Sequence, residues 1–228
     1  MISIIIPTYN EADWIAKTIK LTSAVNGNHE TEIIIVDGGS TDSTFNIAEQ
    51  YGATVLKSAH RCRAVQMNAG ASIAKHEILY FLHADSIPPN NFVTQILSAF
   101  KDGVKSGCFR LAFDYDHWFL KMNAWFTRFD VNAVRFGDQS LFVAKEIFQK
   151  SGGFREDLVM MEDQEIIHRL KKHSRFIVLN DVVTTSARKY LNNGIFKTQG
   201  IFYLIWAMYY LGYSQELMSN VHKRLIRK

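Results

Sequence analysis

The chain has 228 residues, of which 47% are hydrophobic, and this is enough to bury one substantial core. Its 26 basic and 22 acidic residues leave a net charge of only +4, which is too dispersed for the dense basic face of a nucleic-acid-binding protein. The two cysteines, Cys62 and Cys108, exclude a disulfide framework and a cysteine-rich metal site, so we expect a reducing, cytoplasmic environment. The first apolar segment lacks the basic residues that begin a signal peptide.

Apolar segments and helical segments alternate along the N-terminal part of the chain. Continuous runs of Ile, Val, Leu and aromatic residues predict buried strands at residues 2–6, 33–36, 54–56 and 78–82. We expect Pro7 to end the first of these strands. Helical segments between the strands complete a βαβαβαβ pattern. This pattern predicts a Rossmann-like α/β fold with a mostly parallel sheet flanked by helices.

The rest of the chain continues in mixed order. The expected elements are a helix at 92–100, a strand at 108–113, an aromatic helix at 118–129, a strand at 140–143, a helix at 160–170 and a strand at 176–179. From Gly194 onward the sequence becomes apolar and aromatic, with a basic end. We therefore predict one α/β domain over residues 1–190 and a C-terminal amphipathic helical extension over residues 191–228.

Two acidic residues directly follow two of the predicted strands. Asp37 ends the strand at 33–36, and Asp85 lies just beyond the strand at 78–82. Because the carboxyl ends of parallel strands meet at one edge of a sheet, both acids should lie where open α/β sheets bind ligands. Gly38 and Gly39 would let the backbone approach a ligand closely, and the N-terminus of the following helix would favour negative charge on that ligand.

Five short motifs are spread over residues 2–190. They are Ile4–Glu11 (IIIPTYNE), Ile35–Asp42 (IVDGGSTD), Arg63–Gly70 (RAVQMNAG), Phe81–Ser86 (FLHADS) and the pair Glu162–Asp163. Together they resemble the family 2 glycosyltransferases with the GT-A fold, and the FLHADS motif is similar to a compact bacterial branch of that family. The resemblance implies an inverting enzyme that transfers a sugar from a nucleoside-diphosphate sugar, of the UDP or GDP type, to an acceptor hydroxyl.

The resemblance also assigns donor-binding roles to residues of these motifs. Asp37 would accept hydrogen bonds from the nucleotide base, and Arg188, after the last strand, would bind the diphosphate. The other residues implied in donor binding are Pro7, Tyr9, Glu11, Arg63, Gln66, Asn68, His83, Ala84 and Asp85. Simpler interpretations stay open. Asp37 could merely cap its turn, the polar residues near the helix at 64–74 could face solvent, and Arg188 could be a surface charge.

At the metal site the sequence departs from the family pattern, which has two aspartates in an Asp-x-Asp motif. Here His83 occupies the first position and Asp85 the second. The resemblance implies that both bind Mg²⁺ or Mn²⁺ together with diphosphate oxygens and water, and a histidine ligand suits Mn²⁺ better. His83 could instead pack against the end of the sheet with one hydrogen bond. A literal Asp-x-Asp at residues 114–116 is interpreted as a solvated turn.

Transfer with inversion needs a base that removes the proton of the acceptor hydroxyl as this hydroxyl attacks the sugar. The resemblance assigns this role to Asp163, with Glu162 as an orienting acid, and places Asp138 near the acceptor. From spacing alone, Glu162 and Asp163 are equally typical of a helix N-terminus, where acidic residues stabilise the first turn.

Residues 201–211 form an unbroken apolar and aromatic run of eleven residues. A bilayer-spanning helix needs about 20, which argues against a transmembrane segment. Trp206, three tyrosines and the basic tail fit an interfacial helix, and they equally fit a helix packed on the domain or on a second copy of the chain. The open interpretations are peripheral contact with the inner face of the cell membrane, with a lipid-like acceptor, and a homodimer.

Three other functions compete with glycosyl transfer. A non-catalytic nucleotide-sugar-binding or membrane-associated module would explain His83 at a metal-ligand position. A nucleotidyltransferase would need a glycine-rich loop with a basic residue after the first strand, where this chain has Pro7-Thr8-Tyr9-Asn10-Glu11. An oxidoreductase is disfavoured because no Gly-x-Gly-x-x-Gly motif follows a strand.

Overall fold

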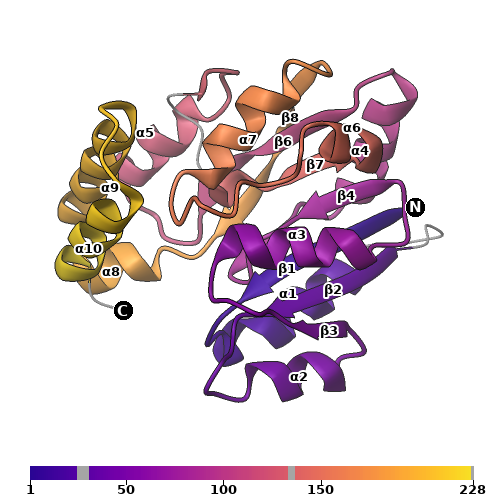
Figure 1. Cartoon of the computed structure of the whole chain (residues 1–228), viewed down its shortest axis with the longest axis horizontal. Helices are drawn as coiled ribbons and strands as arrows, with labels where there is room; N and C mark the ends of the chain where they lie inside the picture. Colours follow the sequence, from indigo (N-terminus) through magenta and orange to yellow (C-terminus); the bar gives the residue numbers. More distant parts are fainter. Residues whose placement is uncertain (25–30, 133–136, 227–228) are drawn as a thin grey trace.

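The computed structural model describes residues 1–24, 31–132 and 137–226, and its centre is one eight-stranded sheet (Figure 1). The strands are β1 (Ile2–Thr8), β2 (Thr31–Asp37), β3 (Thr54–Lys57), β4 (Ile78–Phe81), β5 (Ser86–Ile87), β6 (Ser106–Phe113), β7 (Leu141–Ala144) and β8 (Phe176–Thr185). Their order across the sheet is β3-β2-β1-β4-β7-β6-β8-β5. All strands predicted from the sequence are present, and the α/β class is confirmed.

The sheet is parallel where the sequence alternates strands with helices, and mixed beyond that part. β3, β2, β1 and β4 are parallel to one another, and β6 is parallel to β8. β7 is antiparallel to both β4 and β6, and the short edge strand β5 is antiparallel to β8. Because β7 reverses the direction twice, β6 and β8 run the same way as β1. The carboxyl ends of β1, β2, β4 and β8 therefore open onto one edge.

β1 continues through Pro7, so the expectation that this proline ends the strand was wrong. The Ile5 carbonyl accepts a hydrogen bond from Leu82 N at 3.0 Å, which shows that main-chain groups of odd-numbered residues face β4. The β1–β4 ladder ends at the pair Ile5–Phe81. The main-chain nitrogen of Pro7, which carries no hydrogen, therefore faces the region beyond the end of β4. No hydrogen bond between β1 and β4 is lost there.

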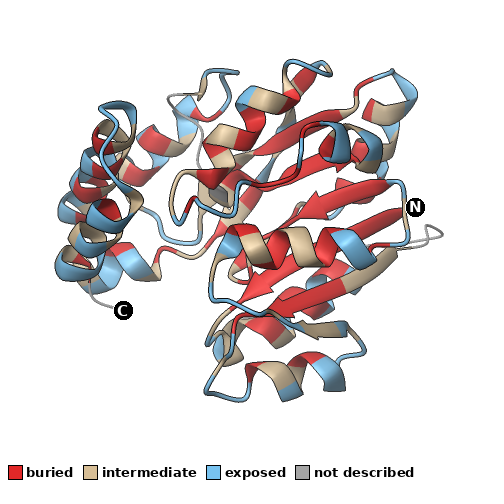
Figure 2. Cartoon of the chain, in the orientation of Figure 1, coloured by how far each residue is buried: buried red, intermediate tan, exposed pale blue. Residues whose placement is uncertain are grey.

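Helices cover both faces of the sheet. They are α1 (Ala12–Ala24), α2 (Thr44–Gln50), α3 (Arg63–Ile73), α4 (Phe92–Lys101), α6 (Lys145–Lys150) and α7 (Glu162–Leu170). Ile4 and Ile6 pack with α1, α2 and α4 on one face, and Ile5 packs with α3, α6 and α7 on the other. The central strands are buried over most of their length (Figure 2). The alternation of side chains along β1 thereby builds a three-layer core.

Four further helices gather at one end of the molecule (Figure 1). They are α5 (Trp118–Phe126), α8 (Arg188–Asn193), α9 (Ile195–Tyr210) and α10 (Gln215–Leu225), and a 3₁₀ helix, η2 (Gly137–Gln139), precedes β7. α9 and α10 share a small apolar core, against which Met160 and Met161 pack. No helix in the described part of the chain has the length and apolarity to cross a membrane. Arg227 and Lys228 of the basic tail lie outside the described residues.

The short elements absent from the sequence-based prediction include β5 and α6. β5 has two residues and exists through its pairing with β8, in which Ser86 opposes Thr185 and Ile87 opposes Thr184. α6 has six residues and directly follows β7. Elements of this length do not show a recognisable periodicity, so tertiary contacts decide them.

A close helix–sheet contact at Gly70 of α3 gives a stability prediction. A Cβ atom there would lie 2.5 Å from Ile5 Cγ2 and 3.1 Å from Val36 Cγ2. Gly70→Ala should therefore destabilise the protein by about 1–3 kcal/mol through overpacking, measured by urea unfolding. The matched control is Gly200→Ala in α9, where a Cβ atom meets nothing within 4 Å. This variant should gain about 0.5–1 kcal/mol, and equal effects of the two changes would contradict the packing argument.

Candidate functional site

The predicted acids meet at the carboxyl edge of the sheet. Asp37 is the last residue of β2 and lies opposite Thr8 of β1. Asp85 lies between β4 and β5, and its carbonyl accepts a hydrogen bond from Ser186 N at 3.1 Å, just after β8. This bond brings the start of α8, with Arg188, to the same edge. Segments from all parts of the α/β domain therefore contribute to one polar site.

Asp37 organises the turn that follows β2. Its Oδ2 accepts hydrogen bonds from Gly39 N at 3.0 Å and from Ser40 N at 2.9 Å, and its Oδ1 accepts one from the Ser40 hydroxyl. The side chain is nearly buried, at 2% exposure. Gly39 has φ +84°, a conformation that glycine adopts without strain. Asp37 thus caps its turn, as the simpler interpretation expected. These hydrogen bonds hold the glycine turn in place at the carboxyl edge of the sheet.

The Gln66 side chain stabilises the strand ends that lead into this turn. Its Nε2 donates hydrogen bonds to Thr8 O at 2.9 Å and to Val36 O at 2.7 Å, linking the ends of β1 and β2. A Cβ atom on Gly38 would lie 3.1 Å from the same nitrogen. Gly38 is therefore needed for the close approach of Gln66, and the Gln66 amide nitrogen is occupied by main-chain carbonyls.

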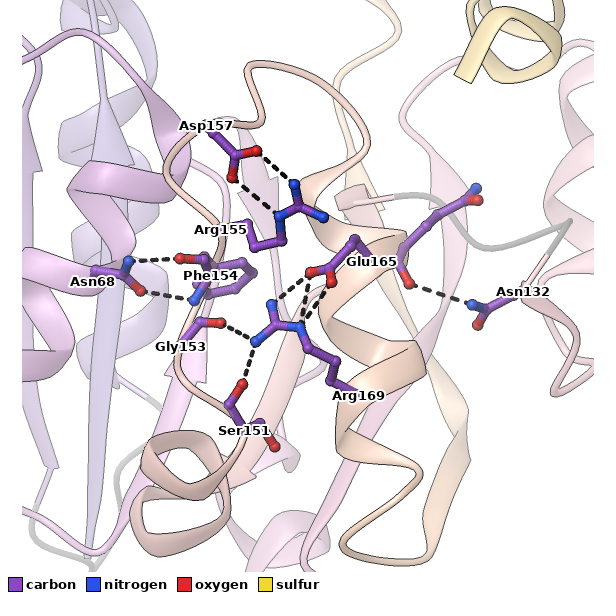
Figure 3. A network of polar contacts seen from close by, with 10 residues as sticks. Asn68, Asn132, Ser151, Gly153, Phe154, Arg155, Asp157, Glu165 and Arg169 are labelled. Carbon is purple, nitrogen blue, oxygen red and sulfur yellow. Dashed lines mark hydrogen bonds and ion pairs between the residues drawn. The ribbon is translucent and has the colours of Figure 1, made fainter. Parts of the chain in front are cut away.

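Asn68 connects α3 to the segment that leads into α7 (Figure 3). Its Nδ2 donates to Phe154 O at 2.8 Å and to Glu156 at 2.9 Å, and its Oδ1 accepts from Phe154 N at 2.9 Å. On the other side, Arg169 of α7 donates to Gly153 O at 2.7 Å and is paired with Glu165. The segment before the Glu162–Asp163 pair is held from both sides.

Three other predicted donor residues line the edge less directly. Pro7 and Ala84 are buried, and the Ala84 carbonyl accepts a hydrogen bond from Thr18 Oγ1 at 2.6 Å. The Tyr9 ring is covered by Arg61, whose guanidinium carbon lies 3.4 Å from the ring centroid. Arg61 is absent from the sequence-based site, although its place two residues before the Arg63 motif could have drawn attention to it.

Arg188 joins two of the predicted acids. Its Nη2 lies 2.5 Å from Glu11 Oε1 and 3.1 Å from Asp85 Oδ2. Burial raises the pKa of Glu11, and the Asp85 charge adds to this, while the hydrogen bond and charge of Arg188 oppose it. The second Glu11 oxygen, Oε2, is buried and has no hydrogen-bond partner among the described residues. One guanidinium thus compensates two carboxylates.

Arg63 has the same function for the second acid pair. Its Nε lies 2.8 Å from Glu162 Oε1, and its Nη2 lies 3.9 Å from Asp163 Oδ2. The Glu162 side chain is fully buried, whereas that of Asp163 is 18% exposed. Burial raises the pKa of Glu162 to about 7, the Asp163 charge adds to this, and the Arg63 charge opposes it. Asp163 is therefore the member of the pair that a ligand can reach.

His83 is paired with Asp138 of η2, at 2.7 Å from His83 Nδ1 to Asp138 Oδ1. Burial disfavours the charged imidazole, but the hydrogen bond and charge of Asp138 outweigh it, so the pKa of His83 lies above its usual value. His83 and Asp163 both line a cavity of about 10 Å³, roughly the size that holds one water molecule. His83 thus lies close to the Glu162–Asp163 pair and has one nitrogen occupied.

The residues at the edge fit a divalent cation that shares its site with phosphate oxygens. Glu11 and Asp85 converge on a single cationic nitrogen, and Glu11 Oε2 is buried with no hydrogen-bond partner among the described residues. Mg²⁺ and Mn²⁺ are commonly held by one or two carboxylates, with phosphate oxygens and water completing the coordination. Within the described residues, no group of three or more His, Cys, Asp or Glu side chains could hold an ion by itself.

The literal Asp-x-Asp at residues 114–116 has other partners. Asp114 Oδ1 accepts a hydrogen bond from Ala187 N at 2.7 Å, and exposed Asp116 is paired with Lys121 at 2.6 Å. Asp114 thus tethers the start of α8, and Asp116 makes a surface ion pair.

Three non-glycine residues with positive φ lie beside the site. They are Asn10 (φ 54°), Ser140 (φ 61°) and Met161 (φ 67°). Asn10 precedes Glu11, Met161 precedes Glu162, and Ser140 lines the small cavity with His83. Each such conformation costs about 1 kcal/mol or more and persists where the surroundings enforce it, which is typical of functional sites.

The chain has the fold of the GT-A glycosyltransferases. Residues 3–158 match the profile of Glycosyl transferase family 2, and the chain belongs to this family. The family predicted from the motifs is thereby confirmed.

Two curated relatives illustrate the range of similarity. The O-antigen chain rhamnosyltransferase WbaN of Salmonella anatum is 26% identical over 193 residues, which are 74% of this chain and 60% of the relative. Glycosyltransferase AglE of Haloferax volcanii is 30% identical over 104 residues, 42% of this chain and 34% of the relative. The chain thus spans 60% or less of the length of these two relatives.

Two solved structures share the fold. The mannosyltransferase PcManGT from Pyrobaculum calidifontis, in complex with GDP-Man and Mn²⁺, has a TM-score of 0.72 at 17% identity, over 90% of this chain and 61% of its own. Glucosyl-3-phosphoglycerate synthase from Mycobacterium tuberculosis, in complex with Mn²⁺, UDP and glucosyl-3-phosphoglycerate, has a TM-score of 0.60 at 16% identity, over 81% and 71%. At these identities the similarity is one of fold.

The buried Glu162 carboxyl gives a pH-dependent prediction. Its folded pKa of about 7 lies above the ordinary value of 4.5, so the folded state binds more protons than the unfolded state between these pH values, and Glu162 lowers stability as pH rises through them. The stability of Glu162→Gln relative to wild type should therefore rise from pH 5 to pH 8, by an amount on the order of 2 kcal/mol. Urea unfolding at both pH values measures this change.

The control for this measurement is Glu49→Gln. Glu49 is exposed on α2, far along the chain from the acid pairs. The free energy of unfolding of Glu49→Gln should change between pH 5 and pH 8 by the same amount as that of the wild type. If the free energy of unfolding of Glu162→Gln also changes with pH as that of the wild type does, Glu162 is not the source of the pH dependence.

Proposed function

We propose that the protein transfers a hexosyl or related sugar, with inversion, from a UDP- or GDP-type nucleotide sugar to an acceptor hydroxyl, with Mg²⁺ or Mn²⁺ as cofactor. The observation that carries this proposal is the arrangement of two arginine-bridged acid groups at one sheet edge. Glu11 and Asp85 converge on Arg188, while Glu162 and Asp163 lie beside Arg63. A donor diphosphate and an attacking hydroxyl need separate charged groups of this kind.

The donor would bind along the carboxyl ends of β1, β2 and β4. Asp37 would hold the base, the Gly38–Gly39 turn would lie against the ligand, and Arg188 would bind the diphosphate. Asp85 would hold the metal, with Glu11 nearby and His83 as a further predicted ligand. A bound Mg²⁺ or Mn²⁺ would supply positive charge that stabilises the departing nucleoside diphosphate.

Asp163 is the proposed base. It is the accessible member of the acid pair, so an acceptor hydroxyl can reach its carboxylate. Glu162 is fully buried and pairs with Arg63, which suits an orienting acid that does not touch the acceptor. Asp138 is more exposed than His83, which supports its proposed role in contacting the acceptor.

We further propose a lipid-like acceptor and a location in the cytoplasm at the inner face of the cell membrane. The support is an aromatic surface on α5 and α9. Its exposed side chains are Trp118, Met122, Trp125, Phe126, Phe196, Tyr203 and Tyr210. Trp118 and Phe119 of α5 contact Phe196 of α9, so the two helices adjoin within this surface. A homodimer would cover the same side chains, so vesicle sedimentation and the oligomeric state distinguish the two.

The second candidate function is a non-catalytic nucleotide-sugar-binding or membrane-associated module. It is favoured by His83 at the metal-ligand position, because Asp138 already occupies one nitrogen of that ring. This module would bind a donor without turning it over.

Donor binding is tested with UDP and GDP, each with and without Mn²⁺, by calorimetry and thermal shift. One nucleotide should bind in a metal-dependent way and raise the melting temperature. Asp85→Asn should weaken this binding by at least about tenfold, because it removes a carboxylate from the proposed metal site. Asp116→Asn is the matched control, since Asp116 belongs to the literal Asp-x-Asp but pairs with Lys121. Equal losses in both variants would reject Asp85 as a specific ligand.

Catalysis is tested with Asp163→Asn. Loss of a general base should lower the rate of nucleoside diphosphate release, with a membrane lipid extract as acceptor source, by about 10²–10⁴-fold. Binding of the nucleoside diphosphate with Mn²⁺ should stay within about twofold of wild type, because Asp163 does not contact the donor in this proposal. Donor binding by the wild type without any turnover would favour the non-catalytic module.

A further inference from the structure

Arg188 bridges two carboxylates through a single nitrogen. Nη2 lies 2.5 Å from Glu11 Oε1 and 3.1 Å from Asp85 Oδ2. The three residues come from the loop after β1, the loop after β4 and the first turn of α8, so they meet only at the sheet edge. All three side chains are mostly buried. This ion pair is therefore part of the site itself and is no loose surface contact.

In the described part of the chain, Arg188 is the one cationic side chain in direct contact with Glu11 and Asp85. One guanidinium compensates two carboxylates, and Glu11 Oε2 is buried with no hydrogen-bond partner among the described residues. A doubly charged cation would balance this pair of acids better than a single guanidinium.

We propose that Arg188 is a placeholder cation, which holds Glu11 and Asp85 in the ligand-free protein and leaves Asp85 for the donor diphosphate when a divalent metal binds. The diphosphate part of this inference rests on the proposed function. The exchange suits the binding preferences of the guanidinium and of the divalent ion. The planar guanidinium fork matches phosphate oxygens in a bidentate way, whereas a compact divalent ion prefers carboxylate oxygen. A long, flexible arginine side chain makes such an exchange without backbone movement.

The exchange links metal binding to donor binding. A metal ion alone must displace Arg188 from Asp85, so the guanidinium loses one of its two carboxylate partners. When a nucleoside diphosphate is present, the released guanidinium gains phosphate oxygens. Each ligand therefore favours the binding of the other, and the coupling is reciprocal. Arg188 therefore occupies the metal-binding carboxylates until the metal and the donor bind.

Arg188→Gln tests the placeholder directly. Without nucleotide, Mn²⁺ titrations followed by electron paramagnetic resonance should show binding that is tighter than wild type by about tenfold, because the competing cation is gone. Binding of UDP or GDP in the presence of Mn²⁺ should become weaker. Opposite changes are the signature, since a damaged site would bind both ligands less well. The double variant Arg188→Gln/Asp85→Asn should lose the gain in Mn²⁺ affinity.

A matched control and a second readout complete the test. Arg155→Gln removes an arginine from the exposed pair with Asp157 and should change neither affinity. Arg188→Gln should melt at a lower temperature without metal, and Mn²⁺ should raise its melting temperature more than that of the wild type. Where Arg188→Gln does not fold, Arg188→Lys keeps a charge without the planar fork. It should shift both affinities in the same directions by smaller factors.

The outcomes separate this inference from the proposed function. If the wild type binds UDP or GDP with Mn²⁺ but Arg188→Gln binds Mn²⁺ no tighter, the placeholder is wrong and the donor proposal stands. If Arg188→Gln gains Mn²⁺ affinity while neither nucleotide binds the wild type, the donor proposal is wrong and the placeholder stands. A fall in Mn²⁺ affinity would show that Arg188 supports the metal site, which overturns the inference.

Discussion

Compensation of buried carboxylates is the constraint on which the site depends. Four acids lie at the sheet edge, Glu11 and Asp85 on one side and Glu162 and Asp163 on the other, and two arginines balance them. An unpaired buried carboxylate is costly, so each arginine fixes the positions of its acids. Each of the two guanidinium groups thus serves two carboxylates, and burial raises the pKa of one of them, Glu162, to about 7.

The sheet topology is what allows these charges to meet. Glu11 and Arg188 are 177 residues apart in the chain, yet their side chains touch. The contact arises because β7 runs antiparallel between β4 and β6, which turns β8 parallel to β1 and brings its carboxyl end to Asp85. β5 then closes the edge by pairing with the end of β8. A fully parallel sheet of the same strands would need longer crossovers to achieve this.

The sequence predicts the positions of residues that lie at strand ends or in motifs. It does not predict contacts that depend on the direction in which a side chain points. Asp37 and Asp85 could be placed at one edge because buried parallel strands fix where their carboxyl ends lie. The pairing of His83 with Asp138 could not be predicted, because it depends on how η2 is placed by the mixed half of the sheet. The inward hydrogen bonds of Gln66 depend on the exact rotation of α3, which periodicity gives only roughly.

The two arginines differ in a way that suggests different tasks. Arg63 holds Glu162, which is fully buried and preceded by Met161 in a left-handed conformation, so this side of the site is fixed before any ligand binds. Arg188 holds Glu11 and Asp85, whose side chains are 16% and 14% exposed, whereas that of Glu162 is fully buried. The buried acid beside the proposed base would thus be fixed in place, whereas the donor side would be completed by its ligands. Such a division would let the proposed nucleotide-sugar donor complete the reactive site as it binds.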